Sequence, residues 1–525
     1  MDKNNGQGII GGALSLTLSA VIVKLLGLIY KIPLSNMLGD EGMGYFNSAY
    51  TVYAFFYLLC TAGVPKAIMI LVSEAKARGS KIEEQNIVRI ATRAFLALGT
   101  LATAIFILFA APLADLIGNS SSRATMIAIA PSIIFISLAG VIRGCLNANM
   151  QLLDIAVSQI IEGVGKLVLG LIFATIAVRR NLPLEIVSAL TILGVTFGSL
   201  FGLLYLSIRY KKVKVEEKHE QKFENGYNVM KRIFGISLPI TLGATVMSMT
   251  NIIDLSVIMR SLLSLGYTEQ EASALYGNYT TLAVPMFNLA IAVITPISAA
   301  FMPTFTRAKF EEDRELMSNS LSSAIGLTSF LSAPLFIGMT VFSREILTVL
   351  FPASKIEIGA TLLILIAPAI FFSSLLLIIN SALEAVGEVK APIISMLCGA
   401  VVKTIVSQIL LCRSDFGISG APIGTVASYA VALCVSGIIY ISKCDARLPM
   451  IKCSLPSYFL AFFAVIFSRI CYDTFFSGLS DLLSLALAIV FAALVYAIFS
   501  VFFGGLRSET LKKNGKIHKN CLTKL

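Results

Sequence analysis

Long apolar segments follow one another along the whole chain, separated by short polar connections. Because the hydrocarbon core of a bilayer is about 30 Å thick, a helix that crosses it takes about 20 apolar residues. By that length the sequence predicts about 14 membrane-spanning helices. They lie near residues 9–34, 45–72, 87–114, 124–146, 153–178, 184–208, 233–259, 275–302, 318–343, 357–380, 391–412, 419–442, 456–476 and 481–503.

The longest polar stretch, residues 209–232, divides these spans into two sets. We expect an N-terminal lobe of spans one to six in residues 1–208 and, after this linker, a C-terminal lobe of spans seven to twelve in residues 233–443. Spans thirteen and fourteen follow in residues 444–503, and a basic tail occupies residues 504–525. Little sequence remains for a soluble domain.

Composition supports this organisation. Of the 525 residues, 57% are hydrophobic and 14% are charged, and the mean hydropathy is +0.85. A soluble protein of this size has too small an interior to bury so much apolar surface. We therefore expect an all-α integral membrane protein that crosses the membrane many times.

The net charge of +11 carries information about orientation. Cations gather in alternate connections, and such connections face the cytoplasm. Both termini are therefore expected in the cytoplasm, although the pair Arg179-Arg180 falls on the opposite side. The basic residues also favour contact with anionic membrane lipids over nucleic acid, because they lie in short loops beside spans. The cations expected on the cytoplasmic side include Lys76, Arg78, Lys81, Arg209, Lys211, Lys212, Arg232, Arg307, Lys309, Lys443, Lys452 and Lys512.

Cysteine and histidine usage predicts neither a metal centre nor a disulfide framework. The nine cysteines are scattered without a C-x-x-C pair, and the histidines, His219 and His518, lie in polar segments. Lys3 precedes the first span and no small-residue cleavage site follows that span, so we expect the span to be retained.

Two stretches of the chain look like copies of one another. Residues 143–166 and 380–403 each contain an apolar helix end, a polar turn and a second apolar helix with a lysine. A duplicated membrane protein with cations at bilayer depth is typical of a transporter. At one constant offset the identical pairs are Leu146/Leu383, Ala148/Ala385, Ser158/Ser395, Val164/Val401, Lys166/Lys403 and Ile172/Ile409.

Lysines occur inside the first predicted span. An ionisable group at mid-membrane costs at least about 2.5–3.5 kcal/mol, so each one is a candidate functional residue. Lys24 and Lys31 share a small and polar helix face with Thr17, Ala20 and Gly27. We expect Lys24 to face a cavity. Lys31 either does the same or extends toward the membrane surface beside Pro33.

The second predicted span is interrupted at Gly63-Val64-Pro65, and Lys66 follows. Proline removes a helix hydrogen bond, and the freed carbonyl groups are tolerated only inside protein or beside water. Lys66 is therefore either a cavity cation or an interfacial lysine next to a simple kink.

Span five carries Glu162 and Lys166 one helical turn apart, in the order that favours an ion pair, with Gln159 on the same face. A structural pair and a functional pair are both open. The equivalent Lys403 has Gly399 in the place of the carboxylate, so it needs another partner or water.

Span seven presents Asn251 and Asp254 on one face and ends near Arg260. Asp254 either binds a coupling cation or a proton, or it pairs with Arg260, which is the interpretation we favour. In span eight, Pro285 and Pro296 accompany Asn278, Tyr279 and Asn288. Such helices either expose backbone carbonyls to a cavity or act as hinges.

Asp40 and Glu41 raise the alternative of a membrane glycosyltransferase, because such enzymes place catalytic carboxylates in an outer loop. Here the segment Gly39–Gly44 is short and glycine-rich, and no large outer domain follows it. A capped turn accounts for these carboxylates better, and no catalytic residue is predicted.

Motifs in a fixed order along the chain support a resemblance to a known family. They are Arg143-Gly144, the turn from Asn147 to Asp154, Ser158-Gln159-Ile160-Ile161-Glu162 with Lys166, Lys24-Leu25-Leu26-Gly27, Leu38-Gly39, Tyr45-Phe46-Asn47-Ser48-Ala49-Tyr50, Ala62-Gly63-Val64-Pro65, Val72-Ser73-Glu74, Pro239-Ile240, Asn251, Asp254 and Tyr276-Gly277. Together they resemble the polysaccharide-transport flippases of the multidrug/oligosaccharidyl-lipid/polysaccharide exporter superfamily. The likeness is to the branch of stage V sporulation protein B and the lipid II flippases. Two departures are Met69-Ile70, where a Ser-Lys pair is expected, and Asn147 in place of Gln.

The resemblance implies two six-helix lobes around a central cavity that work by alternating access. It implies a transporter, not an enzyme, for an undecaprenyl-diphosphate-linked sugar of the peptidoglycan or another cell-envelope polysaccharide, with the spore cortex as one destination. No cofactor is expected, and coupling to protons or sodium stays open, as does the oligomeric state. The cations expected to meet the diphosphate are Lys24, Lys31, Lys66, Arg143 and Lys403.

Three other functions compete with this one. A multidrug cation antiporter of the same superfamily would present acids to its substrate, whereas the deep charges here are mainly basic. A membrane glycosyltransferase or ligase would use Asp40 or Glu41. A scaffold in spore-envelope assembly would have no signature in the sequence.

Overall fold

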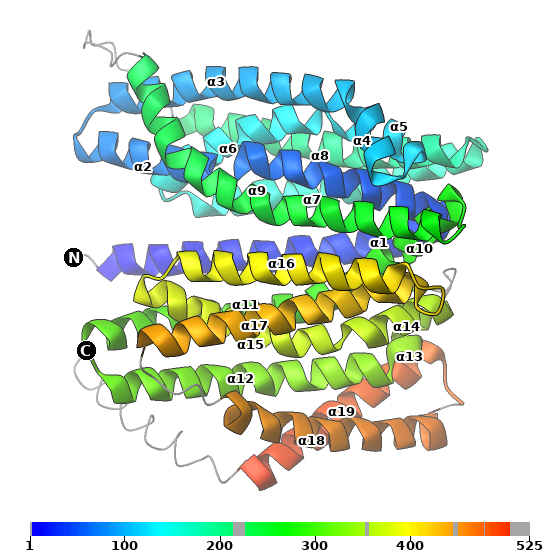
Figure 1. Cartoon of the computed structure of the whole chain (residues 1–525). Helices are drawn as coiled ribbons and strands as arrows, with labels where there is room; N and C mark the ends of the chain where they lie inside the picture. Colours follow the sequence, from blue (N-terminus) through cyan, green and yellow to red (C-terminus); the bar gives the residue numbers. More distant parts are fainter. Residues whose placement is uncertain (1–2, 214–225, 352–355, 445–449, 477, 505–525) are drawn as a thin grey trace. The chain divides into compact units, whose positions relative to one another are not determined.

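The computed structural model describes residues 3–213, 226–351, 356–444, 450–476 and 478–504. These residues form helices and short connections and contain no strand, which confirms the all-α class (Figure 1). The helices are α1 (Lys3–Thr61), α2 (Val64–Ala77), α3 (Lys81–Leu108), α4 (Ala110–Ile117), η1 (Ser120–Ser122), α5 (Arg123–Ile129), α6 (Ser132–Ala148), α7 (Leu152–Arg179), α8 (Leu184–Val213), α9 (Gly226–Ser264), α10 (Glu269–Asn278), η2 (Tyr279–Ala283), α11 (Val284–Phe310), α12 (Arg314–Val341), α13 (Ser343–Leu350), α14 (Ile356–Ile366), α15 (Pro368–Val386), α16 (Lys390–Leu411), η3 (Gly417–Ser419), α17 (Gly420–Cys444), α18 (Met450–Cys471), η4 (Tyr472–Phe476) and α19 (Asp481–Gly504).

The chain is a multi-pass membrane protein by the length and apolar character of its helices. Within the described residues, 11 helices can cross a membrane, or up to 12 when the bent pair Ser120–Ile129 and Ser132–Ala148 counts as one span. The expected number of about 14 is therefore not confirmed. Part of the difference is that Ile29–Ala77, counted as one candidate of 49 residues, contains two helices that meet at the non-helical Gly39.

The helices pack into two compact units. The first contains the described residues up to Thr281 together with Lys403–Ala421, and the second contains Leu282–Phe351, residues 356–402 and the described residues from Pro422 onward. These units follow packing within the chain, so the expected division into lobes at residues 209–232 stays a prediction.

The element labelled α1 consists of two helices that meet at Gly39, inside the segment that the sequence assigned to a loop. Gly39 is kinked, with φ 64°, a backbone conformation that glycine adopts readily, and residues 40–44 are helical again. A Cβ atom at Gly44 would lie 2.0 Å from the carbonyl oxygen of Ser273. The glycine-rich stretch thus permits close packing of α1 on α10. The expected turn is therefore present at Gly39, and it is shorter than the segment of residues 39–44 that the sequence assigned to it.

The interruption predicted at Gly63 is present. Helix α1 ends at Thr61, and α2 begins at Val64 with Pro65 in its first turn. The N–H of Gly63 donates to Thr241 Oγ1 of α9 at 3.2 Å, and a Cβ atom there would lie 2.1 Å from the carbonyl oxygen of Ser237. The break therefore allows α9 to pack directly on the backbone.

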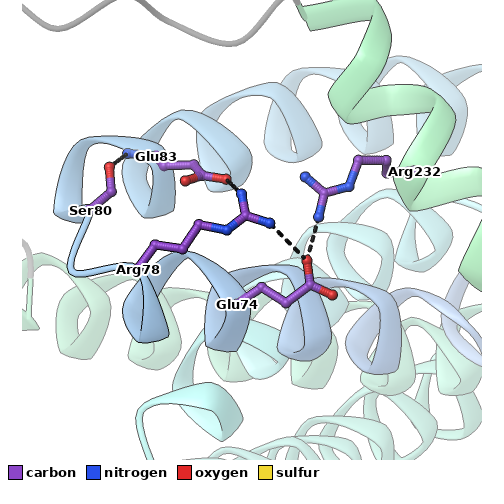
Figure 2. A network of polar contacts seen from close by, with 5 residues as sticks. All are labelled: Glu74, Arg78, Ser80, Glu83 and Arg232. Atoms are coloured by element: carbon purple, nitrogen blue, oxygen red, sulfur yellow. Dashed lines mark hydrogen bonds and ion pairs between the residues drawn. The ribbon is translucent and has the colours of Figure 1, made fainter.

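Apolar packing and charges at helix ends hold the first unit together. One core cluster joins α2, α3, α6 and α9 around Ile68, Leu71, Ile87 and Val141. Figure 2 shows a polar network beside it, in which Glu74 forms ion pairs with Arg78, the residue that follows α2, and with Arg232 of α9. Arg78 also pairs with Glu83 at 3.0 Å, and Ser80 caps α3. This network fixes the α2–α3 turn and the beginning of α9.

The second unit has two core clusters of its own. One joins α11, α12, α15 and α17 around Phe305, Leu321, Ile379 and Tyr440. The other packs α12 against α18 and α19. Arg469 of α18 adds an ion pair with Glu345 of α13 at 2.5 Å and lies over the ring of Phe342.

Both copies of the duplicated stretch form a helix, a short turn and a second helix. The first copy is the end of α6, its turn and the beginning of α7, and the second is the corresponding part of α15 and α16. The similarity in sequence therefore reflects a repeated supersecondary structure.

Candidate functional site

Lys31 of α1 binds the backbone where α10 passes into the π-helical turn η2. Its Nζ atom donates to the carbonyl oxygen of Thr280 at 2.9 Å. A π turn pairs the carbonyl of one residue with the N–H five residues later, and residue 285 is a proline without an N–H. Pro285 thus leaves the Thr280 carbonyl oxygen free to accept a hydrogen bond from Lys31. The Lys31 ammonium group is therefore held inside the protein and does not extend toward the membrane surface.

Lys166 of α7 lies against two tyrosine rings. Its Nζ atom is 4.7 Å from the ring centroid of Tyr50 and 5.4 Å from that of Tyr30, both in α1. The faces of these rings attract the ammonium group. Lys166 also repels the charge of Lys31, which follows Tyr30 directly in the chain. Two cations therefore approach one another from α1 and α7.

The expected ion pair between Glu162 and Lys166 is wrong. Glu162 Oε2 instead accepts from Arg143 Nη2 of α6 at 2.9 Å. The helical spacing allowed either partner, but a guanidinium group reaches the carboxylate across the α6–α7 contact while the tyrosine rings hold the lysine. The side chains of Arg143 and Glu162 are 13% and 26% exposed, so the charge of Arg143 is neutralised in a partly buried pair.

Asp254 of α9 pairs with Lys403 of α16, and not with Arg260 as the sequence suggested. Lys403 Nζ lies 2.9 Å from Asp254 Oδ2. Arg260 is exposed and its Nε atom donates to the carbonyl oxygen of Leu116. The partner that Lys403 was expected to need is therefore Asp254, which comes from a helix far away in the sequence.

Hydrogen bonds join α1 to α10 and to η2. Asn47 donates to Thr281 Oγ1 at 2.9 Å, and the hydroxyl groups of Thr51 and Tyr276 are 3.2 Å apart. Tyr276 also interacts electrostatically with Asp254 and Lys403. Helix α10 with η2 thus adjoins both the Lys31 region and the Asp254–Lys403 pair.

The other residues of the predicted site are exposed, have no described partner, or have a side chain outside the described part of the structure. The side chain of Lys24 is outside the described part of the structure. Lys66 is exposed at the beginning of α2 and makes no hydrogen bond or ion pair with the described residues, and Asn251 is exposed on α9. Asn278 is buried, and neither polar atom of its amide has a partner among the described residues.

The sequence analysis missed Tyr30, Tyr50 and Thr280 as functional candidates. Tyr50 ends one of the family motifs, and Tyr30 precedes a lysine, but neither observation indicated that both rings surround Lys166. Thr280 could have been found from Pro285, because a proline leaves a carbonyl without its usual donor.

The cluster formed by Lys31, Lys166, the rings of Tyr30 and Tyr50, and the Thr280 carbonyl has the chemistry of an anion-binding site. Among the described residues no carboxylate lies within ion-pair distance of Lys31 or Lys166, and no group of three His, Cys, Asp or Glu side chains could hold a metal ion. Two ammonium groups that repel each other without a counter-ion favour a ligand with more than one negative charge. Glu41 accepts a hydrogen bond from Tyr45 at 2.5 Å within α1, a structural contact.

Comparison with known proteins gives one family and several relatives. The family profile described as lipid II flippase MurJ matches residues 34–479. Stage V sporulation protein B of Bacillus subtilis (strain 168) is 24% identical over 516 residues, covering 97% of this chain and 98% of that protein. Lipid II flippase MurJ of the same organism is 23% identical over 443 residues, covering 80% of this chain and 81% of that protein.

Solved structures show the same fold. The inward closed conformation of lipid II flippase MurJ superimposes with a TM-score of 0.69 at 17% identity, covering 94% of this chain and 99% of that one. An inward-facing multidrug resistance transporter of the MATE family, from the MOP superfamily, gives a TM-score of 0.65 at 14% identity, covering 83% and 99%.

Proposed function

We propose that this chain, which belongs to the lipid II flippase MurJ family, carries a lipid-linked polysaccharide precursor from one leaflet of the membrane to the other. Members of this family are transporters and not enzymes. In the bacterial cytoplasmic membrane, with both termini in the cytoplasm, the precursor would leave the inner leaflet. Similarity to stage V sporulation protein B over nearly the whole length supports a glycan of the spore cortex or of the vegetative wall.

The observation that carries the proposal is the approach of Lys31 and Lys166. The protein holds both ammonium groups within a helical membrane unit, against a backbone carbonyl and two tyrosine rings. Neither contact neutralises a charge. A diphosphate that enters between them supplies the missing negative charge, and the loss of mutual repulsion adds to the attraction.

The chemistry of the substrate fits this arrangement. A diphosphate that joins a lipid to a sugar carries two negative charges, which cannot enter hydrocarbon without compensation. Its lipid tail can stay in the bilayer while the lysines bind the charged group. Tyr50, which is 37% exposed, also offers part of a ring face on which a sugar could pack.

A multidrug cation antiporter has the same fold and is the main alternative. Such a protein must offer an unpaired acid to a cationic substrate. The two acids of the candidate site, Glu162 and Asp254, each pair with a cation of the chain. The charges of the described site therefore favour an anionic substrate.

Transport in proteoliposomes tests the proposal. The full chain is reconstituted with a series of prenyl-diphosphate-linked sugars, and a membrane-impermeant enzyme measures how much sugar becomes accessible from outside. In parallel, the same vesicles are assayed for uptake of organic cations. The proposal predicts protein-dependent transfer of at least one lipid-linked sugar. Cation transport without any such transfer would contradict it.

A further inference from the structure

Two arginines of α3 lie on a helix face that is turned toward lipid. Arg89 and Arg93 are exposed and stand one turn apart, so their side chains share this face. The same face continues along the helix with Leu96, Thr100 and Ile107, which are exposed as well. Because α3 is long and apolar enough to cross a membrane, these exposed side chains contact lipid.

The two arginines lie at the depth of the lipid headgroups. A helix rises about 1.5 Å per residue, so Arg93 is about 22 Å and Arg89 about 28 Å from Leu108, the last residue of α3. Leu108 is still exposed and apolar, and the hydrocarbon core of a bilayer is about 30 Å thick. Both guanidinium groups therefore come to the edge of the core on the side of the α2–α3 turn, where the phosphate groups of one leaflet lie.

The carboxylates at the beginning of α3 are bound to other partners. Glu83 pairs with Arg78 at 3.0 Å, and Glu84 accepts a hydrogen bond from the side-chain amide of Asn149 at 3.2 Å. Among the described residues, neither arginine of the exposed face has an ion pair or a hydrogen bond. The arginines of the same unit that pair with a carboxylate near this turn are Arg78, Arg209 and Arg232.

The beginning of α9 brings a further cation to this region. Figure 1 shows α9 beginning beside α3. The ring centroids of Phe95 and Phe234 are 6.2 Å apart, and a Cβ atom at Gly226 would lie 3.7 Å from Ile90 Cδ1. Lys231 lies between these two contact positions of α9 and is exposed. The positive charge therefore extends from α3 to a second helix.

We propose that Arg89 and Arg93 bind the phosphate group of an anionic glycerophospholipid, with Lys231 adding to the attraction. A guanidinium group binds phosphate oxygens through two parallel N–H donors, and two such groups one turn apart face the same headgroup. The acyl chains of the lipid then lie along the apolar part of the exposed face, which a free phosphate ion would leave unused. A zwitterionic headgroup brings its own ammonium group to these cations, so a lipid with a net negative charge fits better.

Crosslinking from the exposed face tests the proposal. A photo-reactive residue replaces Leu96, which lies on the same face as Arg93 and about one turn away. The full chain is placed in phosphatidylcholine nanodiscs that contain a small fraction of alkyne-tagged phosphatidylglycerol or, in a parallel sample, of alkyne-tagged phosphatidylcholine. Tagged phosphatidylglycerol should crosslink several-fold more than tagged phosphatidylcholine. Its half-saturating fraction should rise about fivefold for each arginine that is replaced by glutamine.

Arg179→Gln with Arg180→Gln is the matched control, because it removes two exposed arginines at the end of α7. This control should crosslink as the wild type does. Equal crosslinking of both phospholipids in the wild type would overturn the proposal, as expected of arginines that extend into water. Unchanged crosslinking in Arg89→Gln with Arg93→Gln, or an equal loss in the control, would also overturn it.

Two further outcomes separate the sources of phosphate. Loss of crosslinking in millimolar inorganic phosphate would indicate a site for the free ion. Stronger crosslinking of a tagged prenyl-diphosphate-linked sugar than of phosphatidylglycerol would assign the face to the transported lipid. Either result would overturn the proposal, and neither would contradict the proposed function.

Thermal unfolding in detergent shows whether the arginines have a structural role instead. Without added lipid, Arg89→Gln with Arg93→Gln should unfold at the wild-type temperature, because neither side chain has a described partner to lose. Added phosphatidylglycerol should raise the unfolding temperature of the wild type more than that of the double variant. A lower unfolding temperature of the double variant without lipid, or an equal rise in both proteins, would overturn the proposal.

Discussion

Replacing Lys166 by methionine separates ligand binding from stability, because the two depend on different contacts. The substitution keeps an unbranched apolar side chain and removes the charge. Binding of a diphosphate loses a hydrogen bond to a charged group, which contributes about 1.5–3 kcal/mol. At about 1.4 kcal/mol for each factor of ten, the affinity for a lipid-linked diphosphate should fall about 10- to 150-fold.

The stability of the free protein should change much less. Lys166 loses its interaction with the rings of Tyr30 and Tyr50, a loss of about 0.5–2 kcal/mol. The same substitution removes the repulsion between Lys166 and Lys31, which offsets part of that loss. The net effect should stay within about 1 kcal/mol.

Titration calorimetry with the lipid-linked sugar and thermal unfolding in the same detergent give the two quantities. Lys390→Gln, a substitution of an exposed lysine at the beginning of α16, is the control for charge alone. Unchanged affinity in Lys166→Met would refute the assignment of this lysine to the anion site. A large loss of stability with a proportional loss of affinity would indicate a structural lysine instead.

Two further predictions concern packing in the first unit. Arg143→Met should destabilise the protein by about 1–3 kcal/mol, because it leaves Glu162 partly buried without its donor. A second change, Glu162→Gln, should recover much of that loss. Equal stability of the single and double variants in chemical unfolding would count against the pair. Gly44→Ala should lower the free energy of unfolding by more than about 2 kcal/mol, since its Cβ atom would lie 2.0 Å from the carbonyl oxygen of Ser273. Gly235→Ala, with open space at the Cβ position, should leave the stability unchanged. Similar effects of the two alanines would contradict the close contact at Gly44.

The sequence predicts those parts of the fold that depend on local patterns. The apolar lengths identify a multi-pass helical protein, and the break at Gly63 follows from Pro65 in the next helix. The duplicated stretch correctly predicts that α6–α7 and α15–α16 repeat one supersecondary structure. In each case the physical cause lies within a few residues of the pattern itself.

The errors concern partners that are distant in sequence. Spacing on one helix suggested that Glu162 pairs with Lys166 and that Asp254 pairs with Arg260. In the structure, the two carboxylates instead bind Arg143 and Lys403 from other helices. A helical spacing shows which pairs are allowed, but helix packing determines which cation is nearest. The glycine-rich segment 39–44 contains the expected turn at Gly39, but Gly44 belongs to the following helix, where it serves a helix contact.

The role of Lys24 stays a prediction, because it rests on its position in the first span and on the family resemblance. Lys31 has stronger support in the structure, because its Nζ atom donates to the carbonyl oxygen of Thr280. Neither the position in the first span nor the family resemblance predicts this hydrogen bond.

The central claim is that Lys31 and Lys166 together bind the charged group of a lipid-linked sugar during transfer. The most direct measurement is the initial rate of leaflet transfer of a prenyl-diphosphate-linked sugar in proteoliposomes, compared between the wild type and the double variant Lys31→Gln with Lys166→Gln. The account predicts a fall of about 100-fold or more at low substrate concentration, with the folded protein recovered in equal amount. Transfer at the wild-type rate by the double variant would contradict it.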